Sequence, residues 1–80
     1  MDKGRRELIA IDQRIELYFE AHPGGPAAMR RPRVSKQGGV WVALLGPNVQ
    51  SGVAGIGSTV EAALAAFDRQ YLLRLRPMAA

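Results

Sequence analysis

The sequence contains no cysteine, and His22 is the single histidine among its 80 residues. Without cysteine the chain forms no disulfide and offers no thiolate to zinc, so two devices that commonly stabilise very small domains are excluded. No nucleophile stands near His22 in the sequence, and no pair of carboxylates occupies positions that the pattern would bury. We therefore expect no catalytic site, no metal site and no cofactor, and we expect the protein not to be an enzyme.

Long hydrophobic runs are also missing. No apolar stretch approaches the ~20 residues that cross a bilayer. Charged residues interrupt the N-terminal stretch every few positions, which excludes the apolar core of a signal peptide. We expect a cytoplasmic protein that does not enter a membrane. The hydrophobic content of 48% is typical of a globular chain, and the length predicts a single domain over residues 1–80.

Charge is absent from one long stretch and concentrated in a short one. Residues 37–60 carry no charged side chain, whereas residues 27–36 carry no acid and four bases, Arg30, Arg31, Arg33 and Lys36. Arginine forms forked hydrogen bonds with phosphates, so this segment predicts nucleic-acid binding. The same charges would also protect a strand at the edge of a sheet from pairing with other chains. Both interpretations stay open.

Two amphipathic helices are predicted, over about residues 5–22 and 59–76. The first has an apolar stripe at helical spacing, formed by Leu8, Ile11, Ile15, Tyr18, Phe19 and His22. The stripe of the second helix consists of Val60, Ala63, Leu64, Phe67, Tyr71 and Leu75. The residues Ser58-Thr59-Val60-Glu61 fit a capping box, in which Ser58 accepts a hydrogen bond from the backbone and Glu61 reaches back.

Three strands are expected between these helices, over about residues 29–36, 40–45 and 52–57. Pro32 limits the first strand to a sheet edge. A turn made of Gly38 and Gly39 alone pairs Lys36 with Trp41. This register places Trp41 toward the helices and Arg31 and Arg33 on the open side of the sheet, and a turn one residue longer would reverse the partners of the first strand. The glycines of the third strand leave room that Trp41 is expected to fill.

The predicted fold is therefore α+β. The elements follow the order α-β-β-β-α and form a two-layer sandwich, in which both helices cover one face of a three-stranded antiparallel sheet.

The α-β-β-β-α order resembles that of double-stranded RNA-binding domains, which implies the same fold. That family contacts RNA through lysines at the start of its last helix, and this chain has Ser58-Thr59-Val60-Glu61 there, so no RNA-binding residue is carried over.

Residues 40–67 resemble HicB-like antitoxin domains, whose last helix opens with G-x-T-x-x-E-A. The corresponding residues here are Gly57-Ser58-Thr59-Val60-Glu61-Ala62, and Leu44-Leu45-Gly46-Pro47 replaces the acidic, proline-rich strand end of that group. This resemblance implies a protein partner. The pattern W-x-A-L-L-G, followed by G-x-G-x-T, is similar to that of small phage or prophage proteins, which implies an accessory role.

Two functions follow from these patterns. The first is a phage-type accessory protein that binds DNA or RNA through Arg30, Arg31, Arg33 and Lys36. The alternative is a protein-interaction module, antitoxin-like or homodimeric, that does not bind nucleic acid. Its surface would combine the open sheet face with two leucines outside the main stripe of the last helix: Val40, Val42, Leu44, Ile56, Leu72 and Leu73.

Overall fold

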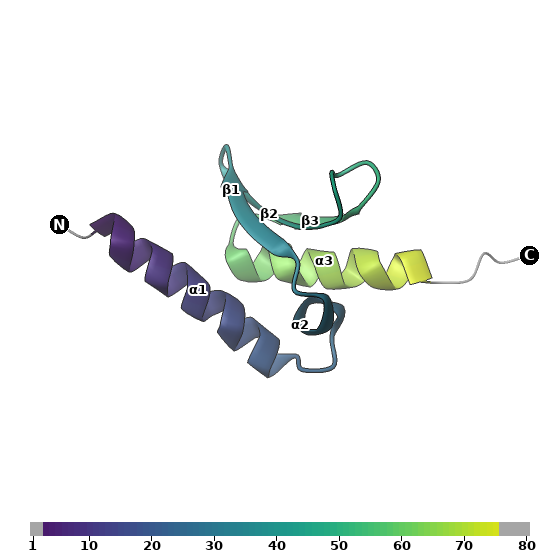
Figure 1. The fold of residues 1–80 in the computed structure, drawn as a ribbon, viewed down its shortest axis with the longest axis horizontal. Coiled ribbons are helices and arrows are strands. Elements are labelled where there is room, and N and C mark those ends of the chain that lie inside the picture. The colour runs from purple at the N-terminus through teal and green to yellow at the C-terminus, as the bar shows by residue number, and fades with distance from the viewer. Residues whose placement is uncertain (1–2, 76–80) are drawn as a thin grey trace, which may run out of the picture.

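The computed structural model of the protein describes residues 3–75 (Figure 1). Its elements are α1 (Lys3–Ala21), α2 (Pro26–Arg30), β1 (Arg33–Gln37), β2 (Val40–Leu45), β3 (Val53–Gly57) and α3 (Val60–Leu75). The three strands form one antiparallel sheet in the order β1-β2-β3, and both long helices lie on the same side of it (Figure 1). The predicted α+β class and the predicted order of the main helices and strands are confirmed.

A short helix, α2, stands where the sequence suggested a loop and the start of a strand. Met29 and Arg30 belong to this helix, so the expectation that the first strand begins at residue 29 is wrong. Pro26 suits the first turn of a helix because its missing N–H would have no partner there. The backbone N–H of Ala27 donates to Asp68 Oδ1 over 2.8 Å, which fixes α2 against α3.

The first hairpin has the register that a two-residue glycine turn predicts. Lys36 pairs with Trp41 and Val34 with Ala43, and Gly38 adopts a φ of +63° that glycine tolerates well. Ala43 is fully buried, and Trp41 packs against the same hydrophobic cluster. Trp41 therefore points toward the helices, as predicted.

The glycines of β3 allow α3 to lie directly on the sheet. A Cβ atom added to Gly55 would collide with the backbone of Ala63 and would lie 2.7 Å from Phe67 Cα. One added to Gly57 would lie 2.7 Å from the backbone nitrogen of Ala63. The expectation that Trp41 fills the space left by these glycines is wrong, because the backbone of α3 occupies it.

The hydrophobic core lies between the sheet and the helices. Val60, Leu64 and Phe67 of α3 are fully buried, and Phe19 of α1 joins them. Ile11, Ile15 and Tyr18 are partly buried against the same cluster, whereas His22 is exposed. The structure does not describe the side chains of residues 3–9 and 75, which include Leu8 and Leu75, and residue 76 of the predicted last helix lies outside the described residues.

The N-cap of α3 is Thr59 rather than the predicted Ser58. Thr59 Oγ1 accepts a hydrogen bond from the backbone N–H of Ala62 over 3.0 Å. The third residue of the helix is then Ala62, so the capping box does not form. Glu61 instead pairs with Arg14 of α1.

Candidate functional site

The face of the sheet opposite α3 has no helix over it and is apolar along β2 and β3 (Figure 1). Alternation along the paired strands places five apolar residues there, Val40, Val42, Leu44, Ala54 and Ile56, which we call the open face. Ile56 is 56% exposed and Val40 38% exposed. Apolar side chains exposed on a sheet face are typical of a surface that binds another molecule.

Val42 is the centre of the open face. It is only 5% exposed although no helix covers it, because Ser35 and Ile56 stand directly opposite it on the two neighbouring strands. Leu44 is half-buried and Ala54 lies beside it on β3. The open face therefore exposes Val40 and Ile56 around a buried Val42 and a half-buried Leu44 and Ala54.

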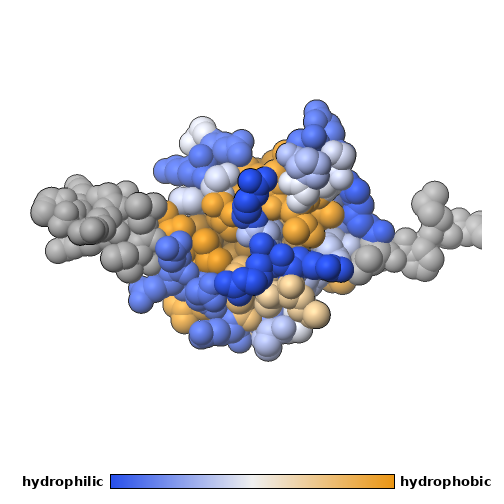
Figure 2. Space-filling view, in the orientation of Figure 1, coloured by the Kyte–Doolittle hydropathy of each residue, from blue (hydrophilic) through white to orange (hydrophobic). Residues whose placement is uncertain are grey.

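Two projections border the open face at its ends. The β1–β2 turn and the loop between β2 and β3 both rise on the side away from the helices (Figure 1), and Figure 2 shows hydrophobic atoms between them. Asn48 closes the second loop, since its Oδ1 accepts from the backbone N–H of Ser51 over 2.8 Å and from Ser51 Oγ over 2.9 Å. The loop also exposes Val49, which is 53% exposed, so this end of the open face is of mixed character.

A third, polar border comes from β1. Arg33, Ser35 and Gln37 alternate onto the same side of the sheet as the open face, and all three are exposed. This side of the sheet is thus polar along β1 and apolar along β2 and β3.

The basic segment does not form one surface. Arg31 adopts a left-handed backbone conformation with φ of 52°, donates to Glu16 Oε2 over 2.6 Å and stacks its guanidinium over Phe19. It therefore lies on the helix side, and the expectation that Arg31 shares the open side of the sheet with Arg33 is wrong. Arg30 donates its Nε–H to the hydroxyl of Tyr71 over 2.8 Å.

The other two bases of the segment point to opposite sides of β1. Arg33 lies on the side of the open face, as predicted, whereas Lys36 pairs with Trp41 and places its ammonium 5.8 Å from the centre of the indole ring. Arg30 and Arg31 make contacts within the chain, and Arg33 and Lys36 diverge. Nucleic-acid binding by these four residues stays a prediction, and their arrangement does not strengthen it.

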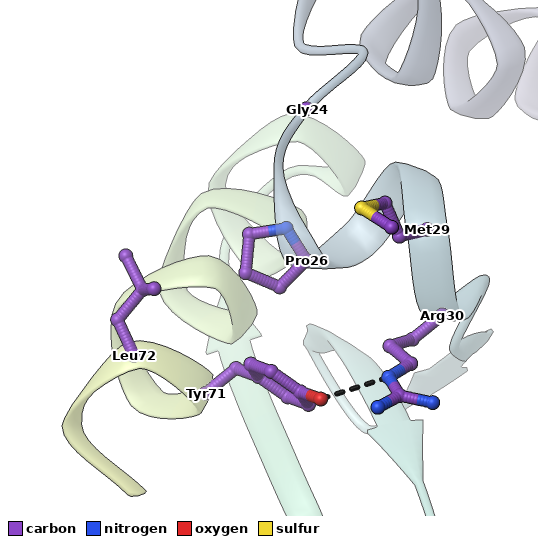
Figure 3. A pocket seen from close by; sticks show the side chains of 6 residues that line it. All are labelled: Gly24, Pro26, Met29, Arg30, Tyr71 and Leu72. Carbon is purple, nitrogen blue, oxygen red and sulfur yellow. Dashed lines mark hydrogen bonds between the residues drawn. The ribbon is translucent and has the colours of Figure 1, made fainter. Parts of the chain in front are cut away.

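The two leucines predicted to bind a partner lie on different flanks of α3. Leu72, 57% exposed, lines a shallow hollow of about 280 Å³ between α2 and α3, together with Met29, Arg30 and Tyr71 (Figure 3). Leu73, 53% exposed, is the next residue along the helix and points about 100° away from Leu72. Neither belongs to the open face, so the predicted partner-binding residues form separate surfaces.

Ionisable groups with shifted pKa values lie on the helix side of the molecule. Burial, followed by a hydrogen bond to Asp68 Oδ2, raises the pKa of Tyr18 well above its ordinary value. The hydrogen bonds from Arg14 lower the pKa of Glu61, and the same pairing raises the pKa of Arg14. These groups fasten α1 to α3 and are remote from the open face.

The Arg14–Glu61 pair predicts a small, pH-dependent contribution to stability. Because the pKa of Glu61 is lowered in the folded state, its contribution is present above the ordinary glutamate pKa and is lost as the pH falls through the folded-state value. Both side chains are more than 40% exposed, so Glu61→Gln should cost no more than about 1 kcal/mol at pH 7. Urea unfolding at pH 7 and pH 3 measures this difference.

Glu20→Gln, at an exposed position of α1, is the matched control and should leave stability unchanged. If wild type and Glu61→Gln lose the same stability between pH 7 and pH 3, the pair does not act as described.

Two searches among residues 3–75 give negative results. No helix in this part of the chain is both long enough and apolar enough to cross a membrane. The side chains that the structure describes, those of residues 10–74, include no group of three or more histidine, aspartate or glutamate residues placed to hold a metal ion.

Comparison with protein-family models, curated proteins and solved structures finds no match for the chain. The resemblances to double-stranded RNA-binding domains, HicB-like antitoxins and phage proteins therefore stay predictions.

Proposed function

We propose that this protein is a non-enzymatic protein-interaction module that binds its partner through the open face of the sheet. The observation that carries the proposal is the exposure of Val40 and Ile56 beside Val42 and Leu44 on a face without a helix. Covering this strip removes apolar surface from water, at about 25 cal/mol for each Å². The polar border along β1 then orients the partner.

Nucleic-acid binding is the weaker alternative because the bases are dispersed. An arginine that already bonds to Glu16 or Tyr71 must break that contact to reach a phosphate. The interaction module requires no such rearrangement.

The proposal predicts that acidic substitutions on the open face abolish partner binding. A carboxylate at position 56 would be buried without a partner charge, so Ile56→Asp should reduce recovery of the partner at least 10-fold. The same result is expected for Val40→Asp. Co-precipitation from cells that make the protein, followed by quantitative mass spectrometry, measures the recovery.

Leu17→Asp is the matched control, because Leu17 is 61% exposed but lies on α1. Circular dichroism should show that all three variants remain folded. Recovery that survives Ile56→Asp and is lost in Leu17→Asp would exclude the open face as the binding surface.

A second prediction separates the two functions. Fluorescence anisotropy with a 20-nucleotide DNA or RNA should show no more than non-specific association, with a Kd of about 10⁻⁴ to 10⁻⁶ M at physiological salt. Replacing Arg33 and Lys36 with alanine should weaken even this association only slightly. Tight binding that depends on Arg30, Arg31, Arg33 and Lys36 together would favour the nucleic-acid function instead.

A further inference from the structure

A hollow of about 550 Å³ lies between α1 and β1, at the polar border of the open face. Four residues of β1 and two of α1 line it: Arg33, Val34, Ser35, Gln37, Asp12 and Ile15. Successive side chains of a strand point to opposite faces, so a hollow lined by neighbouring residues of β1 runs along the outer edge of that strand. Leu44, which pairs with Arg33, also lines the hollow and connects it to the open face.

β1 directs unpaired backbone groups toward this hollow. The sheet order is β1-β2-β3, so β1 pairs with β2 alone. The two-glycine turn closes on the pair Gln37–Val40, and the residues that flank such a turn bond to each other through their backbones. Alternation then points the N–H and C=O groups of Val34 and Lys36 away from β2. The part of the chain that the structure describes offers no other strand to satisfy them.

The bases of β1 favour an occupant that carries an acid. Arg33 is exposed and forms no ion pair with any side chain that the structure describes, and Lys36 is exposed on the same strand. A second copy would add its own β1, which carries the same two bases and no acid. Like charges on neighbouring strands are destabilising, and charged edges protect sheets against such pairing. A strand of another protein that carries an acid turns the same charges into an attraction.

The α1 wall of the hollow favours a polypeptide over a nucleic acid. Ile15 and Val34 are apolar and half-buried, and Asp12 is an exposed acid that lines the same hollow. Phosphates would be repelled by Asp12 and would gain nothing from the apolar pair. The side chains of an extended segment alternate, so it can place an acid toward Arg33 and apolar side chains toward Ile15 and Val34.

We propose that the hollow between α1 and β1 binds an extended segment of the partner protein, which adds to the sheet beside β1. β1 has five residues, so a similar number in the segment pairs with it, over about 17 Å. An acidic residue of the segment lies beside Arg33, and apolar residues on its other face pack against Ile15 and Val34. The adjoining part of the partner covers Leu44 and the open face. This inference rests on the proposed function and names the partner's binding segment.

The test uses a phage-displayed library of random 12-residue peptides, selected on the full chain. We expect enrichment of peptides in which acidic and apolar residues alternate over about five positions without proline. The best peptide is then synthesised with N-methyl groups on alternate backbone amides. Methylation of the set that faces β1 should weaken binding at least 10-fold, whereas methylation of the other set should leave it nearly unchanged.

Two substitutions in the lining of the hollow should have opposite effects on peptide binding. Arg33→Gln removes the cation that the acid meets and should weaken binding about 5-fold, as expected for one partly exposed ion pair. Asp12→Asn removes the acid on the α1 wall and should strengthen binding about 2-fold. Arg69→Gln, at an exposed position of α3, is the matched control and should change nothing. Circular dichroism verifies that each variant is folded.

The results that would overturn the inference differ in what they say of the proposed function. Peptides that shift only the NMR signals of Val40 and Val42, and are insensitive to N-methylation and to Arg33→Gln, would exclude strand addition while leaving the open face as an interaction surface. A dimer seen by light scattering, with signals of β1 that shift on dilution, would assign the hollow to a second copy. A library that yields no binder, or only basic peptides, excludes the acidic segment. If, in addition, Ile56→Asp leaves co-precipitation unchanged, the proposed function fails as well.

Discussion

Replacing Gly55 with alanine is expected to lower the free energy of unfolding by about 3 kcal/mol or more, at the upper end of the range for overpacked cores. The added methyl group would meet the backbone of Ala63 and Phe67, and a helix backbone cannot move aside as a flexible side chain can. The helix would have to separate from the sheet, which would expose the core around Phe67 and Leu64. Urea unfolding followed by circular dichroism measures the loss.

Gly39→Ala is the control for this prediction. A Cβ atom at Gly39 would meet no atom within 4 Å, and the residue does not adopt a positive φ. The free energy of unfolding should change by less than about 0.5 kcal/mol. Equal effects of the two substitutions would show that α3 does not lie on β3 as described.

Phe67→Ala is expected to cost about 3–5 kcal/mol, because Phe67 is fully buried and its loss leaves a cavity beneath the sheet. Natural domains are stable by only about 5–15 kcal/mol, and a chain of this size is near the lower end, so much of the protein should be unfolded at 37 °C. Thermal unfolding monitored by circular dichroism gives the shift in Tm.

Leu73→Ala, six residues further along α3, is the matched control. Leu73 is 53% exposed and outside the core, so its removal should cost less than about 0.5 kcal/mol. A large loss of stability from Leu73→Ala, or a small one from Phe67→Ala, would mean that another face of α3 is buried.

The sheet and its register were predictable because they depend on local rules. Alternation along residues 40–45 and a turn of two glycines fix which side chains share a face, and Lys36 opposite Trp41 follows directly. The open face was foreseen for the same reason, except for Ala54, which alternation along β3 would have indicated. Such patterns involve residues close together in the sequence.

The predictions that were wrong concern features that depend on contacts between distant parts of the chain. The five-residue helix α2 is held by a hydrogen bond to Asp68, 41 residues away, which no local pattern signals. Arg31 is drawn to the helix side by Glu16 and Phe19, and Arg30 by Tyr71. A run of bases in a sequence therefore gives the total charge of a segment but not the direction of each side chain.

The most direct measurement of the central claim is site-specific photo-crosslinking in cells that make the protein. A photoreactive phenylalanine analogue replaces Ile56 on the open face in one variant and Gln13, an exposed residue of α1, in another. We predict that position 56 yields a discrete crosslinked protein, identified by mass spectrometry, and that position 13 does not. Crosslinks of equal yield and identity from both positions, or crosslinks from position 56 to nucleic acid alone, would contradict the account.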